Sequence, residues 1–275
     1  MYEYPDNTSK ENLYLNSKLK IFQIYKNLKY PSVKIDSYFQ VYEEIFKNYI
    51  GKKITFVEVG VLAGGSLFMW KDYFGKNARV IGIDLNPEAK KWEKYGFEIF
   101  IGSQSRDKFW NYFYDKVGKI DILLDDGGHH NKQKIATVYS SIPNINDGGM
   151  IVVEDSHASY MSQFGNPSKL SFINFSKYMI DNINYRFSNI KLKKGQKNEK
   201  NVFSISFYES IVVFNINSKK CFEPEHVNSF GDPYSVTDFS SSEFFPKIQK
   251  FIDIKLSILK KMPIIKKIVR ILFYK

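Results

Sequence analysis

The sequence contains, at residues 120–133, the stretch IDILLDDGGHHNKQ, in which an apolar run ends in two acids, two glycines and two histidines. A short continuous apolar run bounded by glycines predicts a strand that is buried on both faces, as in a parallel sheet. Asp125 and Asp126 then fall at its carboxyl end, which is the edge where doubly wound sheets bind ligands. The stretch therefore predicts an α/β fold and the position of a functional site.

Strand and helix patterns alternate on both sides of this stretch. Strands are predicted at 54–59, 79–85, 97–102, 120–126 and 150–155, with helices at 37–50, 66–74, 87–95, 106–117, 132–145 and 167–187. Such alternation predicts a doubly wound, mostly parallel sheet with helices on both faces. Two further β-runs around Tyr208-Glu209-Ser210 predict a late antiparallel pair, which makes a seven-stranded Rossmann-like sheet.

The composition favours one large domain with additions at both ends. The chain has 275 residues and a single cysteine, Cys221, so no intramolecular disulfide is possible and a reduced, cytoplasmic setting is expected. We predict an N-terminal extension at 1–34, a catalytic domain at 35–217 and a C-terminal extension at 218–275. No apolar signal core and no long apolar span are present, so neither secretion nor a transmembrane helix is predicted.

The positive charge is concentrated at the C-terminus. Residues 247–275 hold nine Lys and Arg and one acid, which leaves +3 of the total +11 for the rest of the chain. Lysines alternate there with apolar residues at helical spacing on both sides of Pro263. Such a segment can lie on an anionic membrane, here the inner face of the cytoplasmic membrane. The alternative is a helical hairpin packed on its own domain or on a second subunit, as in a homo-oligomer.

A glycine turn follows the first predicted strand. The run ITFVEVGVLAGGSLFMW, residues 54–70, places Gly60, Gly64 and Gly65 between a strand and a helix, where glycines allow a ligand to approach the backbone closely. Asp84 ends the next strand and is suited to bind the two hydroxyls of a ribose. Leu62 stands where a dinucleotide motif has its second glycine, so the turn suits an adenosine without phosphate. The alternative is an ordinary turn with a solvated Asp84.

A second acidic pair ends the next predicted strand. Glu154 and Asp155 follow residues 150–153, and a right-handed crossover usually places this strand beside 120–126. Four carboxylates would then meet and repel one another unless a cation compensates them. We predict a hard divalent cation bound by Asp126, Glu154 and Asp155, with Asp125 facing the cofactor or a backbone turn. The alternative for the second pair is a solvated strand end.

The two histidines have different expected roles. His129 lies three residues beyond Asp126, after two glycines, and could take a proton from a hydroxyl held at the site. The alternative for either histidine is to cap the helix that begins near Asn131, and this alternative is favoured for His130.

Five motifs together resemble a known family. They are FVEVGVLAGGSLFMW, IGIDLNP, GSQS, ILLDDGGHH and GGMIVVEDSHASY. These motifs resemble the class I S-adenosylmethionine-dependent methyltransferases. More narrowly, they resemble the metal-dependent sugar O-methyltransferases of the macrocin and mycinamicin type and their relatives in bacterial capsule clusters. The resemblance covers residues 35–215, and its DDGGH…GG…VED combination is more specific than the glycine turn.

The resemblance implies a cofactor, a metal ion and a base. S-adenosylmethionine would be bound by Glu58, Gly60, Gly64, Ser66, Asp84, Gln104 and Asp125. Mg²⁺ would be bound at Asp126, Glu154 and Asp155, and His129 would act as the catalytic base. The chain departs from the family at Gly102-Ser103-Gln104, where many relatives read GDQ, and at DDGGH in place of DDGSH.

The expected function is Mg²⁺-dependent methylation of a sugar hydroxyl. The acceptor would be a sugar or nucleotide sugar, such as a precursor of a capsule or lipopolysaccharide, with His130, His157 and Tyr160 near it. One alternative is a non-sugar acceptor, such as a phosphate or phosphoramidate group, a catechol or a small antibiotic. Another alternative is a non-catalytic scaffold. A nucleic-acid substrate is not expected, because the predicted cleft is acidic.

Overall fold

A seven-stranded sheet runs through the protein in its computed structural model, which describes residues 15–164, 169–187, 199–227, 229 and 231. The strands are β1 (Thr55–Val59), β2 (Arg79–Asp84), β3 (Glu98–Ile101), β4 (Ile120–Asp125), β5 (Ile145–Val153), β6 (Val202–Phe207) and β7 (Val212–Ile216). Their order is β3-β2-β1-β4-β5-β7-β6, and β7 is antiparallel to both of its neighbours. The predicted fold class, with its late antiparallel pair, is confirmed.

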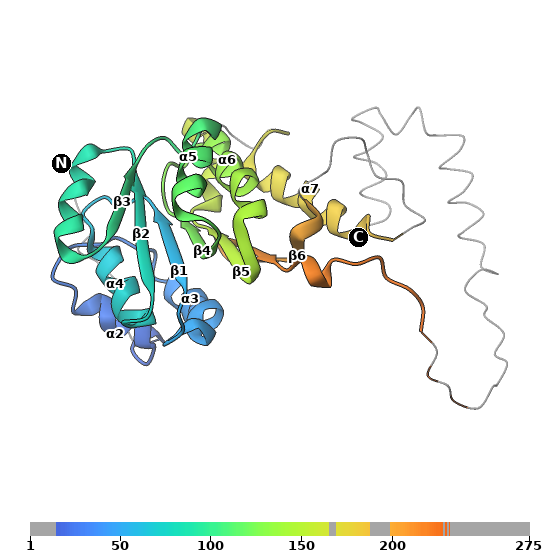
Figure 1. Cartoon of the computed structure of the whole chain (residues 1–275), viewed down its shortest axis with the longest axis horizontal. Helices are drawn as coiled ribbons and strands as arrows, with labels where there is room; N and C mark the ends of the chain where they lie inside the picture. The colour runs from blue at the N-terminus through green and yellow to red at the C-terminus, as the bar shows by residue number, and fades with distance from the viewer. Residues whose placement is uncertain (1–14, 165–168, 188–198, 228, 230, 232–275) are drawn as a thin grey trace. The chain divides into compact units, whose positions relative to one another are not determined.

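Helices cover both faces of the sheet (Figure 1). The α-helices are α2 (Lys20–Lys26), α3 (Tyr38–Phe46), α4 (Gly65–Phe74), α5 (Asp107–Val117), α6 (Asn131–Ser141) and α7 (Phe172–Asn184). Helices α2, α3 and α4 contribute to one hydrophobic cluster, whereas α5, α6 and α7 contribute to the other. Alternate residues of one strand join opposite clusters: Ile122 packs with the first and Leu123 with the second. The near-continuous apolar strands follow from this double burial.

Several elements differ from their predicted form, mostly by a few residues at their ends. The short helix predicted at 87–95 is a 3₁₀ helix, Pro87–Tyr95. Strand β5 begins at Ile145, five residues before its predicted start, because α6 ends at Ser141 and Pro143 sits in the 3₁₀ turn that follows. The apolar run alone therefore marked the buried part of β5 and missed its more exposed beginning.

The segment before residue 35 contributes to the hydrophobic cluster that contains α3 and α4. Helix α2 lies within the predicted N-terminal extension, yet its Ile21 and Phe22 are buried in the same cluster as α3 and α4. The chain divides into two units after Pro224. The basic segment 247–275 lies outside the described residues, so its membrane contact stays a prediction. Within the described ranges, no helix has the length and hydropathy needed to span a bilayer.

The strand register brings the carboxyl ends of β1, β4 and β5 side by side. Val59 pairs with Asp125, and Asp125 pairs with Val153. Gly60 therefore faces the turn after β4, and it has φ +95°. A Cβ on Gly60 would lie 2.2 Å from the carbonyl oxygen of Asp126. Two backbones approach here more closely than any side chain allows, so the glycine is required.

We expect Gly60→Ala to lower the free energy of unfolding by about 2 kcal/mol more than Gly51→Ala, measured by urea denaturation. Gly51 also has a left-handed φ, +75°, but a Cβ there has no atom within 4 Å. The control therefore carries the backbone strain without the clash. Equal losses would show that the β1 and β4 turns move apart freely.

Candidate functional site

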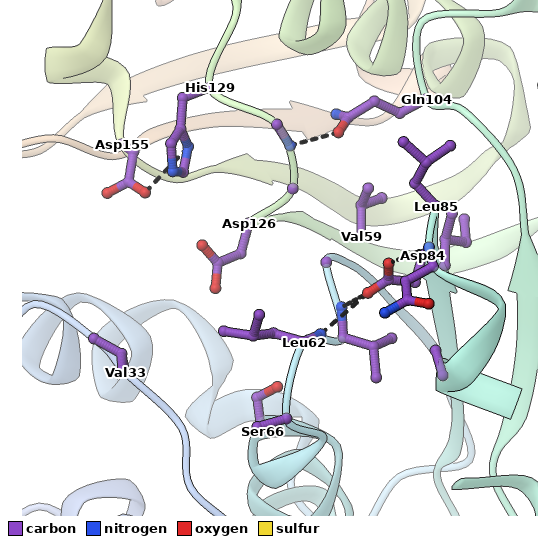
Figure 2. Close-up of a pocket in the computed structure, with 18 of the residues that line it drawn as sticks. Val33, Val59, Leu62, Ser66, Asp84, Leu85, Gln104, Asp126, His129 and Asp155 are labelled. Carbon is purple, nitrogen blue, oxygen red and sulfur yellow. Dashed lines mark hydrogen bonds and ion pairs between the residues drawn. The ribbon is translucent and has the colours of Figure 1, made fainter. Parts of the chain in front are cut away.

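A cavity of about 690 Å³ opens at the carboxyl ends of the strands. This volume lies within the range of small-molecule sites. Figure 2 shows Asp126, His129 and Asp155 toward one end of the cavity and Asp84 and Leu85 toward the other. The segment 31–35, which precedes α3, forms a further wall. The cavity therefore lies where the sequence places the site, but one wall comes from the predicted N-terminal extension.

Asp84 shapes the glycine turn at the cofactor end of the cavity. Its Oδ2 accepts hydrogen bonds from the backbone N–H groups of Val61 (2.8 Å) and Leu62 (3.1 Å), and its Oδ1 accepts one from Asn86 (2.8 Å). Leu62 has φ +43°, a conformation that is uncommon for a leucine. The carboxylate of Asp84 thus holds the turn in place while still lining the cavity.

Gln104, from the segment after β3, contacts the end of β4, the turn that follows it, and α6. Its Nε2 donates to both carboxylate oxygens of Asp125 (2.9 and 3.0 Å) and to Thr137 (3.0 Å), and its Oε1 accepts from the backbone N–H of Gly128 (2.6 Å). Asp125 is fully buried, and burial raises the pKa of its carboxyl, although Lys134 and Gln104 oppose this rise. These contacts stabilise the turn that carries the DDGGH motif.

A buried ammonium lies among the acidic residues of the cleft. The Nζ of Lys34 is 2.5 Å from Asp126 Oδ2, 3.1 Å from Glu154 Oε2 and 3.7 Å from Glu58 Oε1. Burial alone lowers the pKa of Lys34, but the charges of the three carboxylates outweigh it and hold that pKa well above its usual value. Lys34 therefore stays charged and compensates the acids.

Two of these acids are enclosed in the protein interior. Burial and the charge of Asp126 raise the pKa of Glu154 well above its usual range, and the Tyr42 hydroxyl donates to this carboxyl. Glu58 accepts hydrogen bonds from Ser66 Oγ (2.7 Å) and Trp70 Nε1 (3.0 Å), which anchor α4 to β1. Burial raises the pKa of Glu58 to about 7. Glu58 thus lies behind the cavity wall, as an anchor of the helix that follows the glycine turn.

Asp155 occupies a strained position at the end of β5. It has φ +52°, and Lys134 Nζ holds its carbonyl oxygen at 2.5 Å. The Tyr38 hydroxyl donates to Asp155 Oδ1 at 2.6 Å and accepts from the Asp155 backbone N–H at 3.1 Å. Asp155 Oδ2 lies 3.5 Å from Nδ1 of His129. The carboxylate is thereby aimed at a histidine ring that faces the cavity.

The three histidines predicted near the site occupy different positions. His129 lines the cavity, and its ring meets the edge of Phe164 at 5.4 Å between centroids. His130 is exposed and is the N-cap of α6, with its backbone N–H donating to Gln133 Oε1 at 3.2 Å. His157 lines the cavity and hydrogen-bonds Ser210 Oγ through Nδ1. The structure therefore gives His129 and His157 access to a ligand and gives His130 the capping position.

The structure brings eight of the predicted site residues to the cavity wall. These eight are Gly60, Ser66, Asp84, Gln104, Asp126, His129, Asp155 and His157. Six described residues of the predicted site lie outside that wall, namely Glu58, Gly64, Asp125, His130, Glu154 and Tyr160. Burial explains Glu58, Asp125 and Glu154, which face their own partners, whereas Tyr160 is 58% exposed on the outer surface. Lys34 and Tyr38 were missed, because neither belongs to a motif.

The carboxylates do not surround a common empty point. Asp126 and Glu154 both contact the Lys34 ammonium, and Asp155 turns toward Tyr38 and His129. Among the residues the structure describes, no three His, Cys, Asp or Glu side chains are arranged to hold a metal ion. The oxygen donors suit Mg²⁺ chemically, but the arrangement with Lys34 in place does not fit the ion. The predicted metal site stays a prediction.

Comparisons with known proteins agree with the resemblance that the motifs indicate. No family model matches the sequence. The 8-demethyl-8-alpha-L-rhamnosyl tetracenomycin-C 2'-O-methyltransferase of Streptomyces olivaceus is 28% identical over 188 residues, which are 64% of this chain and 49% of the relative. The demethylmacrocin O-methyltransferase of Streptomyces fradiae is 26% identical over 157 residues, 53% of this chain and 39% of the relative. The chain thus matches half or less of the length of these relatives.

A solved structure shares the fold. It is the MycE methyltransferase from the mycinamycin biosynthetic pathway in complex with Mg, SAH and mycinamycin VI, with a TM-score of 0.63 at 21% identity, over 72% of this chain and 53% of that one. The chain is similar in sequence to macrocin-type O-methyltransferases and in fold to a mycinamicin-type one. The predicted resemblance is therefore confirmed, with the Rossmann-like methyltransferase fold.

We expect the pH dependence of stability to carry the signature of Glu58. Because burial raises the pKa of Glu58, the folded state keeps the Glu58 proton up to about pH 7, while the unfolded state loses it near pH 4.5. The folded state therefore binds more protons in this interval, and the free energy of unfolding falls as pH rises, by up to about 3 kcal/mol. Urea denaturation of wild type and Glu58→Gln across the interval measures the difference.

Glu98→Gln is the matched control for this experiment. The hydrogen bond from Arg79 lowers the pKa of Glu98, so the stability that Glu98 contributes is lost as pH falls, the opposite sign. A wild-type pH slope retained by Glu58→Gln would show that Glu58 is ionised throughout.

Proposed function

We propose that the protein transfers a methyl group from S-adenosylmethionine to a hydroxyl of a sugar. The observation that carries this proposal is the pairing of His129 with Asp155 in a cavity that also contains the glycine turn and Asp84. A base and a nucleoside-binding edge then share one enclosed space. The two relatives, which are O-methyltransferases by name, support the same reaction class.

The cavity suits a cationic cofactor. S-adenosylmethionine supplies a methyl group on a positively charged sulfonium. The cavity wall is acidic, because four carboxylate residues line it against two lysines: Asp84, Glu88, Asp126 and Asp155 against Lys34 and Lys91. The close backbone approach at Gly60 leaves no side chain between β1 and the cofactor end. Asp84 is the residue positioned to accept hydrogen bonds from ribose hydroxyls.

His129 is the proton acceptor in this proposal. A hydroxyl oxygen that attacks the methyl carbon must lose its proton as the new C–O bond forms and the S–C bond breaks. The neutral His129 imidazole can take that proton, and the Asp155 carboxylate beside Nδ1 stabilises the imidazolium that results. Tyr38 and Lys134 hold Asp155 in place, so the pair is aligned before the acceptor binds. Alignment of the reacting groups then supplies much of the rate.

The acceptor is proposed to be a sugar, either nucleotide-activated or part of a surface glycan such as a capsule or lipopolysaccharide. His157 and Phe164 line the cavity beside His129, which gives a sugar one polar and one flat apolar contact. Incubation with labelled S-adenosylmethionine and a panel of nucleotide sugars and rhamnosides, followed by mass spectrometry, identifies the acceptor. Methylation of catechols or phosphate groups alone would replace the sugar assignment with another acceptor class.

We expect His129→Ala to lower kcat by about 10²–10⁴-fold, because the hydroxyl loses its base. Calorimetry with S-adenosylhomocysteine should give an unchanged Kd, which separates proton transfer from cofactor binding. His130→Ala is the control, since His130 caps α6 and lies outside the cavity wall. A larger effect at His130 would move the base to that residue.

We expect Asp84→Ala to weaken S-adenosylhomocysteine binding about tenfold or more, through the lost ribose acceptor and the loosened turn at Val61 and Leu62. Calorimetry measures the Kd directly. Asp84→Asn keeps one acceptor oxygen for the turn and should fall between wild type and Asp84→Ala. Unchanged affinity in both variants would contradict the placement of the cofactor.

A further inference from the structure

Lys34 is buried in a place where a lysine is rarely found. Its side chain is 1% exposed, although a lysine ammonium normally stays in water because its desolvation is costly. Three carboxylates lie within 4 Å of its Nζ. Such burial is stable because the acids provide the compensating charge, and the acids in turn depend on Lys34.

The Nζ of Lys34 lies between acids from two adjacent strand ends. Asp126 follows β4 and Glu154 follows β5, and the ammonium bridges them at 2.5 and 3.1 Å. A divalent cation shared by these two carboxylates would need the same space. The Lys34 ammonium and a divalent cation placed side by side in this buried gap would repel each other strongly. Only one of them can occupy the gap at a time.

The segment that carries Lys34 is a connection between two helices and belongs to neither of them. Residues 27–37 lie between α2, which ends at Lys26, and α3, which begins at Tyr38, and 31–35 form a wall of the cavity. Withdrawal of the lysine side chain therefore requires adjustment of a connecting segment, not of the sheet. Asp126 and Glu154 would then lose their compensating charge, which a proton or another cation can replace.

We propose that the Lys34 ammonium and a divalent cation are alternative occupants of the Asp126–Glu154 carboxylate pair, so that a metal enters when Lys34 withdraws. Lys34 is then a positioning residue, because it holds the carboxylates in place while no metal is bound. The proposal concerns the site of the proposed methyl transfer, but its test measures cation binding and does not require turnover.

The test is titration of the full-length protein with Mn²⁺, with free Mn²⁺ followed by electron paramagnetic resonance. We expect Lys34→Gln to bind one Mn²⁺ at least about tenfold more tightly than wild type, because the competing charge is gone. Lys34→Arg keeps the charge and should stay at or below wild-type affinity. Lys132→Gln, which removes an exposed lysine on α6, should match wild type.

A second substitution locates the bound ion. In Lys34→Gln combined with Asp126→Asn, the gain in Mn²⁺ affinity should disappear. Thermal unfolding gives an independent readout: Mg²⁺ should raise the Tm of Lys34→Gln by more than that of wild type. If Lys34→Gln unfolds without metal, its recovery by Mn²⁺ in circular dichroism supports the same conclusion.

Two results would overturn the proposal. One is equal Mn²⁺ affinity in wild type and Lys34→Gln, which would mean that lysine and metal do not compete. The other is tight Mn²⁺ binding that survives Asp126→Asn. Calorimetry with S-adenosylhomocysteine on the wild type is run alongside, because failure to bind it would contradict the proposed function and leave the cation competition standing.

Discussion

The structure depends on neutralising several carboxylates in a small buried volume. Parallel strands must end at a common edge, and in this chain β1, β4 and β5 each bring an acid to that edge or just beyond it. The desolvation of several unpaired charges in the interior would cost more than the free energy of unfolding of a typical domain. The elements around the edge are therefore arranged to supply donors and cations.

Each of these partners comes from a different part of the chain. Tyr38 and Tyr42 reach the edge from α3, Lys134 reaches it from α6, and Lys34 reaches it from the segment before α3. Helices on both faces of the sheet are thereby tied to one cluster. The acidic residues thus connect helices on the two faces of the sheet, and some of them also line the cavity.

The sequence predicts the sheet and the position of the cavity well, because both follow from local patterns. Apolar runs identify buried strands, and the residues after these runs fall at the carboxyl edge of the sheet, where Asp84, Asp126 and Asp155 line the cavity. The direction of a side chain at a strand end depends on contacts from distant segments. Such contacts turn Glu154 inward to Tyr42 and Lys34, and no local pattern records them.

The wall formed by residues 31–35 also links ligand binding to local stability. This wall lies within the segment that connects α2 to α3, and a ligand in the cavity would contact it. Any ligand that binds the closed wall more tightly than the open one raises the free energy required to open it. A bound ligand would thus slow the local unfolding of α2 and α3, which lie before the sequence motifs of the site.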